Sequence, residues 1–318
     1  MDPDSVVEYD FPPFLRQFKS GRVERYCGVG GGGTVPAGAD PAGTGVSSRD
    51  AVINPSTGLW ARLFLPRGDV RLPVVVYYHG GAFVVGSTAW RTMHVYLTRL
   101  AADANVLVVS PEYRLAPEHP LPAAFDDAWE ALQWVASHAA AAAATTSKDR
   151  DPWLAEHGDL SRVFLGGASA GATIAHNMAA RAGAVRHQLP SFEGLLVVHP
   201  FFAGEARISG AEPEDRAKAG AFWRFRCPGT PGLDDPLCNP FAEWRGVACG
   251  RVLVCVAGED ALRDRGVWYA RGLAASGYPG EVALHESAGV GHVFYYADPD
   301  CEQARAMHAR VLDFLRHA

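Results

Sequence analysis

The sequence predicts an α/β fold in which a mainly parallel sheet lies between helices on both of its faces. Short apolar runs rich in Val and Leu recur along the chain, and segments with helical periodicity separate them. Continuous β-branched runs are typical of central parallel strands, which are buried on both faces. Strands that alternate with helices form such a sheet through crossover connections. We therefore expect one domain over residues 1–318.

The expected strands differ in the strength of their pattern. Residues 59–65 alternate between apolar and polar, as a half-buried strand does. The continuous apolar runs are 74–78, 106–110, 163–165, 195–198 and 252–256, with a weaker run at 282–285. The expected helices are 124–139, 170–182, 266–276 and 302–317.

Two segments interrupt this alternation, and we expect them to form a cap over one end of the sheet. In residues 1–26, apolar side chains recur at helical spacing, which indicates a folded segment rather than a tail. These side chains are Phe11, Phe14, Leu15 and Phe18. Residues from about 201 to 250 are rich in Pro, Gly, Trp and Phe, which indicates an insertion.

Composition limits the partners and the compartment. The formal net charge is −6, which argues against nucleic acid or an anionic membrane as a partner. The six cysteines lack Cys-x-x-Cys spacing, so we expect free thiols, no metal, and a location in the cytoplasm or nucleus. Residues 28–33 match the G-x-G-x-x-G pattern of dinucleotide sites, but Pro36 and a loop follow where a helix is required. We expect a monomer or a homodimer.

The strongest chemical signal is a Gly-x-Ser-x-Gly motif at residues 167–171. It follows the expected strand 163–165 and begins a helix, which is the context of a nucleophile elbow. Such a turn forces the serine into a strained conformation, and Gly167 and Gly171 leave room for neighbouring backbone. Ser169 then lies at a helix N-terminus, whose dipole favours developing negative charge. Ser169 is therefore the candidate nucleophile of an α/β hydrolase.

A serine hydroxyl needs an adjacent base, and in this fold the order along the chain is serine, acid, histidine. His292 lies in a glycine-rich loop after the last expected strand and is the candidate base. Asp260 follows the strand 252–256 and is the candidate acid, which accepts the imidazole N–H and selects its tautomer. Glu259 and Asp264 are close rivals, although Asp264 also fits the start of a helix.

A His-Gly-Gly-Ala segment at residues 79–82 follows the expected strand 74–78. Its small residues allow the N–H groups of Gly80 and Gly81 to face a tetrahedral oxyanion, together with the N–H of Ala170. We expect His79 to brace this loop. Four aromatic residues are candidates to line a substrate pocket, with core packing an equally open interpretation: Phe83, Phe222, Trp223 and Phe294.

With these motifs, the chain resembles the plant carboxylesterases of the hormone-sensitive-lipase-like branch of α/β hydrolases. Further matching segments cover nearly the whole length: DFPPF at 10–14, GRVER at 21–25, YRLAPEHP at 113–120, FDD at 125–127, DP at 235–236, NPF at 239–241 and GHVF at 291–294. The resemblance implies hydrolysis of small carboxylic esters through an acyl-enzyme, without a cofactor.

The same resemblance implies two alternatives. Some members of the family dehydrate 2-hydroxyisoflavanones or transfer an acyl group within glucose esters, and the same base and oxyanion hole can serve both reactions. The related gibberellin receptors keep the fold but lack the catalytic histidine, so a small-molecule receptor is the other alternative. The presence of Ser169, Asp260 and His292 together argues against the receptor.

Overall fold

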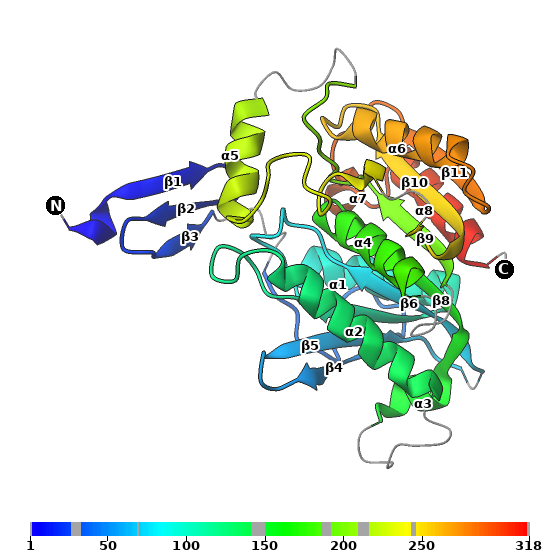
Figure 1. Cartoon of the computed structure of the whole chain (residues 1–318). Helices are drawn as coiled ribbons and strands as arrows, with labels where there is room; N and C mark the ends of the chain where they lie inside the picture. The colour runs from blue at the N-terminus through cyan, green and yellow to red at the C-terminus, as the bar shows by residue number, and fades with distance from the viewer. Residues whose placement is uncertain are drawn as a thin grey trace.

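The computed structural model describes residues 2–26, 33–68, 70–140, 150–185, 192–208, 216–242 and 246–316. These residues form an eight-stranded sheet with helices on both faces and a separate three-stranded sheet near the N-terminus (Figure 1). The strand order in the large sheet is β11-β10-β9-β8-β6-β7-β5-β4. Residues 28–32, which carry most of the G-x-G-x-x-G match, lie outside the described residues.

The large sheet is mainly parallel, as the sequence predicts. Its parallel strands are β6 (Leu72–Tyr78), β7 (Leu107–Glu112), β8 (Gly158–Ala168), β9 (Phe192–Val198), β10 (Cys249–Ala257) and β11 (Glu281–Ser287). Two antiparallel strands, β4 (Ser47–Asn54) and β5 (Leu59–Leu65), complete one edge. Strand β4 is not among the expected strands, because its exposed edge position tolerates a largely polar sequence.

Helices cover both faces of this sheet. One layer contains α2 (Ala123–Ala140), α3 (Pro152–His157), α4 (Ala170–Ala184) and α6 (Arg263–Ala275). The other contains α1 (Arg91–Ala104), which the sequence analysis did not identify, with α7 (Phe294–Ala297) and α8 (Glu302–Arg316). Side chains of β6 alternate between the two layers, with Val74 and Val76 in one apolar core and Val75 in the other. No helix among the described residues is long and apolar enough to cross a membrane.

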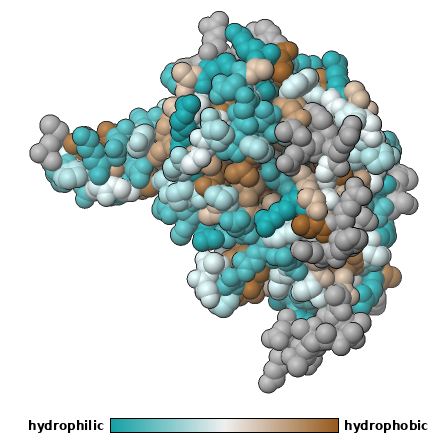
Figure 2. Space-filling model, in the orientation of Figure 1, coloured by the Kyte–Doolittle hydropathy of each residue, from teal (hydrophilic) through white to brown (hydrophobic). Residues whose placement is uncertain are grey.

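Residues 2–26 are folded, as expected, but the helical interpretation of their apolar spacing is wrong, because they form the small sheet. A short 3₁₀ helix, η1 (Pro3–Ser5), precedes β1 (Val7–Phe11), β2 (Leu15–Phe18) and β3 (Val23–Arg25). Pro12 and Pro13 lie in the turn between β1 and β2, and proline lacks the N–H that a helix interior requires. The small sheet projects from the body of the protein and presents a mostly hydrophilic surface (Figures 1 and 2).

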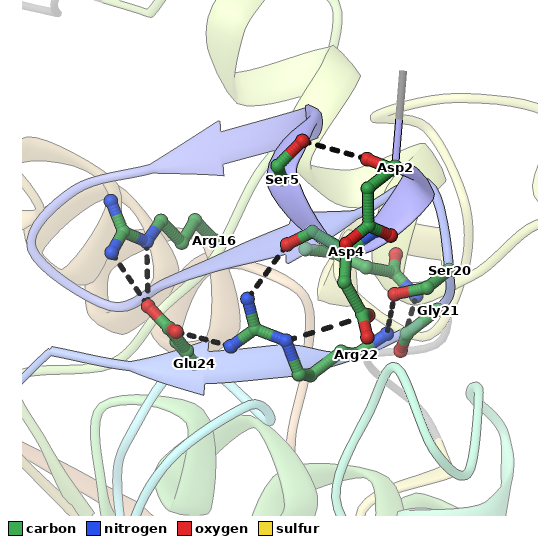
Figure 3. A network of polar contacts seen from close by, with 9 residues as sticks. Asp2, Asp4, Ser5, Arg16, Ser20, Gly21, Arg22 and Glu24 are labelled. Atoms are coloured by element: carbon green, nitrogen blue, oxygen red, sulfur yellow. Dashed lines mark hydrogen bonds and ion pairs between the residues drawn. The ribbon is translucent and has the colours of Figure 1, made fainter.

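Exposed charges cross-link the small sheet. The carboxylate of Glu24 on β3 lies 2.6 Å from Nη2 of Arg16 on β2 and also pairs with Arg22 (Figure 3). Arg22 in turn donates to the carbonyl oxygen of Asp4 at 3.0 Å. Exposed pairs of this kind contribute only about 0.2–1 kcal/mol each. Attachment to the rest of the protein therefore depends on other contacts.

Arg25 and Phe11 both attach the small sheet to its surroundings. Arg25 donates from Nε to the carbonyl oxygen of Val84 at 2.6 Å, and its Nη1 lies 2.8 Å from the carboxylate of Glu118. The ring of Phe11 stacks on Phe222 of α5 (Arg216–Arg226), with 4.6 Å between centroids. The small sheet is thus joined both to the loops of the large sheet and to α5.

We predict that His176 on α4 makes folding sensitive to acid. The ring is buried against Tyr269, and burial lowers the pKa of His176 from 6.5 to about 4. The unfolded chain therefore binds a proton below about pH 6.5, whereas the folded chain binds it only near pH 4, so stability falls as pH falls through this window. Between pH 7 and pH 5, the titration of His176 lowers the free energy of unfolding by about 2 kcal/mol.

Urea unfolding at pH 7 and pH 5 measures this effect. The loss of unfolding free energy should be smaller in His176→Gln than in the wild type, whereas the exposed control His119→Gln should match the wild type. An unchanged pH dependence in His176→Gln would contradict the prediction.

Candidate active site

Ser169 lies at the junction of β8 and α4 in a strained backbone conformation. Its φ is +56°, in the left-handed region that non-glycine residues avoid. A Cβ on Gly171 would lie 2.0 Å from the carbonyl oxygen of Tyr78, and a Cβ on Gly167 would lie 2.3 Å from that of Gly171. Both glycines are therefore required by the close approach of backbone at this turn.

The structure brings Ser169, His292 and Asp260 into one chain of hydrogen bonds. Nε2 of His292 lies 3.0 Å from Oγ of Ser169, and its Nδ1 lies 2.6 Å from Oδ2 of Asp260. The three residues follow β8, β11 and β10, so they meet at one edge of the sheet. The imidazole side chain is 34% exposed and the carboxylate 3%, so the ring faces solvent with the acid buried behind it.

The environment of Asp260 keeps its carboxyl group ionised. Burial alone would raise the pKa of Asp260, but the hydrogen bond from His292 and its charge bring it below the ordinary value. The N–H of Leu262 also donates to Oδ1 at 2.9 Å. Of the two rivals, Glu259 is exposed and Asp264 pairs with Arg263 at 2.8 Å. The tertiary structure therefore selects Asp260 as the partner of His292.

The His-Gly-Gly-Ala loop lies against the nucleophile turn. A Cβ on Gly80 would lie 2.9 Å from the carbonyl oxygen of Ala168 and 3.3 Å from Cβ of Ser169. Gly81 has a φ of +123°, and a Cβ there would lie 1.9 Å from the carbonyl oxygen of Val85. The N–H groups of Gly80, Gly81 and Ala170 make no hydrogen bond to any described residue. They are thus available to a negatively charged oxygen beside Ser169.

His79 braces this loop, as the sequence analysis expects. Its Nδ1 donates to the carbonyl oxygen of Gly80 at 2.7 Å, and its ring stacks on Tyr113 with centroids 4.1 Å apart. Burial lowers the pKa of His79, although the nearby Glu112 opposes this shift. The neutral ring therefore serves the loop as a hydrogen-bond donor.

A cavity of about 280 Å³ opens beside Ser169 and His292. Gly80, Gly81 and Ala82 line it together with Ser169 and His292. Its apolar walls are Pro13, Phe14, Trp90, Met93, Val293 and Tyr296. The small N-terminal sheet therefore supplies part of one wall, and the unexpected helix α1 supplies another.

None of the four aromatic residues proposed from sequence lines this cavity, so that prediction is corrected. Phe83 and Trp223 are both 0% exposed. They pack with Phe222 around the buried guanidinium of Arg226, whose Cζ lies 4.1 to 5.8 Å from the three ring centroids. Cation–π attraction and core packing account for these aromatic residues without a ligand. Phe294 instead stacks on His199, with 5.7 Å between centroids.

His199, which the sequence analysis did not select, lies beside the triad. It directly follows β9 and is 1% exposed. Ligand atoms of His199, Asp260 and His292 lie within 4.8 Å of one another. Because Asp260 and His292 already share a hydrogen bond and Nδ1 of His199 accepts the N–H of Val293, we interpret this group as the triad with a neighbouring histidine rather than as a metal site. Its position at the end of a parallel strand was the signal that could have identified His199.

A second cavity, of about 510 Å³, lies between α1 and α8. It is larger than the cavity beside Ser169 but contains no triad residue. The two cavities share Thr92 and Tyr296 as lining residues. The triad residues Ser169 and His292 thus line only the smaller of these two cavities, and Tyr296 lies between the two.

Comparisons with known proteins agree with this geometry. The α/β hydrolase fold family matches residues 75–296. Tuliposide A-converting enzyme 1 of Tulipa gesneriana, named as chloroplastic, is 43% identical over 98% of this chain and 79% of its own length. A 2-hydroxyisoflavanone dehydratase of Glycyrrhiza echinata is 42% identical, over 97% of this chain and 96% of its own. Probable carboxylesterase 2 of Arabidopsis thaliana is 39% identical, over 95% of this chain and 94% of its own length.

Among solved structures, an esterase of Pyrobaculum calidifontis superimposes with a TM-score of 0.67. The match is 28% identical in sequence and covers 85% of this chain and 84% of the esterase chain.

We predict that Asp260, and neither of its rivals, activates Ser169. Asp260→Asn removes the acceptor that selects the imidazole tautomer, so the rate at which a fluorophosphonate probe labels Ser169 should fall on the order of 10⁴-fold. Glu259→Gln and Asp264→Asn are matched controls and should label within about twofold of the wild type, as surface changes usually do. A comparable loss in Asp264→Asn would refute the assignment.

Proposed function

This chain belongs to the α/β hydrolase family and is a carboxylic ester hydrolase, and we propose that Ser169, His292 and Asp260 hydrolyse small carboxylic esters in it. The observation that carries this proposal is the chain of hydrogen bonds from Asp260 through His292 to Ser169. The N–H groups of Gly80, Gly81 and Ala170 support it, because they make no hydrogen bond to any described residue and are available to the oxyanion of an ester.

The geometry supports a two-step acyl transfer. Ser169 attacks the ester carbonyl while Nε2 of His292 takes its proton, and Asp260 stabilises the resulting imidazolium. The oxyanion binds the N–H groups of Gly80, Gly81 and Ala170, and one such donor is worth roughly 3 kcal/mol of barrier. His292 then protonates the leaving alcohol. Water, activated by the same histidine, releases the acid and restores Ser169.

The cavity favours small substrates. Its volume of about 280 Å³ lies near the lower end of ligand sites, which span about 300–1,000 Å³. Its apolar walls suit short aliphatic or aromatic groups on the ester. We propose a single domain over residues 1–318 in which residues 1–26 and about 201–250 form the cap, the latter ending where β10 begins. The contact of Phe14 with this cavity and of Phe11 with Phe222 supports that role.

Dehydration is a second candidate reaction, favoured by the 42% identical dehydratase of Glycyrrhiza echinata. A dehydration needs His292 as the base and needs no acyl-enzyme. Ser169→Ala would therefore abolish ester hydrolysis and spare dehydration. The receptor alternative has less support, because a protein that only binds its ligand does not need the pairing of His292 with Asp260.

We propose that the protein acts in the cytoplasm or nucleus, as a monomer or homodimer. Five cysteines among the described residues are free thiols, which fits a reducing compartment. The tulip relative, by contrast, is named as chloroplastic. Localisation of a fluorescent fusion of the full chain, with the molar mass from light scattering, tests both proposals.

We predict that turnover depends on the Ser169 hydroxyl. With 4-nitrophenyl acetate, Ser169→Ala should lower kcat by at least about 10³-fold, because the acyl-enzyme cannot form. The matched control is Ser87→Ala, which removes a hydroxyl from the same cavity and should retain most of the activity. Equal rates for wild type and Ser169→Ala would overturn the mechanism.

We also predict that Tyr296 limits the length of the substrate. Tyr296→Ala should join the two cavities, so the ratio of kcat/KM for octanoate over acetate esters should rise at least about tenfold, since each buried CH₂ contributes about 0.8 kcal/mol. Tyr296→Phe keeps the ring and should leave the ratio near the wild-type value. An unchanged ratio in Tyr296→Ala would show that the acyl chain of the substrate does not extend toward the second cavity.

A further inference from the structure

We propose that His199 is a positioning residue, which holds His292 in its reactive orientation by fixing the backbone that follows it. The inference rests on the proposed function, since His292 is taken as the general base. His199 does not line the cavity beside Ser169, and it is 1% exposed. Its side chain acts on the backbone of the histidine loop through Val293, and its ring also lies beside the ring of His292, with 5.8 Å between centroids.

The side chain of His199 holds the residue next to His292. Its Nδ1 accepts the N–H of Val293 at 2.9 Å. Val293 has a φ of +46°, in the left-handed region, where a β-branched residue is an outlier. Such a conformation persists only where its surroundings determine it. The hydrogen bond from Val293 to His199 is one such determinant, and it acts on the backbone directly after His292.

The backbone of His199 connects this contact to the other two triad loops. Its N–H donates to the carbonyl oxygen of Cys255 at 2.8 Å, on the strand that leads to Asp260. Its own φ is +43°, also left-handed. The residue before it, Val198, accepts the N–H of Ser169 at 2.9 Å. His199 therefore lies where the chain segments of nucleophile, acid and base converge.

The ring of His199 is neutral when it accepts the hydrogen bond from Val293. Because Nδ1 accepts a hydrogen bond, the proton must be on Nε2. Burial, followed by the charge of His292, lowers the pKa of His199 to about 4. Asp260 opposes this shift, and His285 adds a smaller lowering. A neutral neighbour does not repel the imidazolium that forms on His292. Phe294 and Tyr295 hold the ring in place by aromatic contacts.

Two substitutions separate this role from simple packing. In His199→Asn the side-chain Oδ1 can replace Nδ1 as the acceptor for Val293, although it fills less space. His199→Leu fills more of the space but offers no acceptor. We expect kcat for 4-nitrophenyl acetate to fall about 100-fold in His199→Leu, with KM within about threefold, because misplacement by about 1 Å costs that much. In His199→Asn, kcat for the same substrate should be within about fivefold of the wild-type value.

The reverse order, with His199→Leu more active than His199→Asn, would show that the ring only fills space and would overturn the proposal. Equal activity of both variants with the wild type would overturn it as well. His119→Leu, at an exposed position, is the control and should be fully active.

A second measurement does not depend on turnover. Nuclear magnetic resonance of the ¹⁵N-histidine-labelled protein at pH 6 should show His199 as the neutral Nε2–H tautomer, identified by the loss of its signals in His199→Asn. A protonated ring or the Nδ1–H tautomer would refute the proposed contact. If the wild type hydrolyses no ester, the proposed function fails, and this spectrum still tests the placement of His199. The spectrum of the wild type also tests the contact between His199 and Val293 if His199→Leu does not fold.

Discussion

The close approach of backbone at the turn between β8 and α4 is the constraint on which the rest of the site depends. Gly171 lies so near the end of β6 that a Cβ would be 2.0 Å from the carbonyl oxygen of Tyr78. This contact places the N-terminus of α4 directly beside the loop that follows β6. The nucleophile and the N–H groups of Gly80 and Gly81 are adjacent for that reason. One steric requirement thus places Ser169 beside the loop that carries Gly80 and Gly81.

The site also concentrates strained backbone. Ser169, His199 and Val293 all have left-handed φ values although none is glycine. Strain of this kind costs about 1–3 kcal/mol per residue and persists where hydrogen bonds and packing over-determine the conformation. Here the compensating hydrogen bonds come from the ends of neighbouring parallel strands. The sheet therefore supplies the rigidity that holds the side chains of His292 and Asp260 at hydrogen-bonding distance.

A buried arginine links α5 to the His-Gly-Gly-Ala loop at residues 79–82. Nη1 of Arg226 donates to the carbonyl oxygen of Ala82 at 3.0 Å, and aromatic rings surround the guanidinium. Burial lowers the pKa of Arg226 from its ordinary value, and the surrounding rings compensate part of the lost hydration. The small N-terminal sheet packs on α5 in turn. The small sheet, α5 and the loop at residues 79–82 are thus connected by direct contacts around the cavity.

The sequence by itself located the parallel strands along the chain and the loops that carry Ser169 and His292, because apolar runs and tight glycine turns are encoded by neighbouring residues. It left Asp260, Glu259 and Asp264 open, since the direction of each side chain depends on the loop around it. Only the tertiary structure showed that Phe83 and Trp223 lie around Arg226, and that three segments within residues 7–25 pair as strands. Both results depend on partners that are distant in sequence, and a local pattern carries no information about those partners.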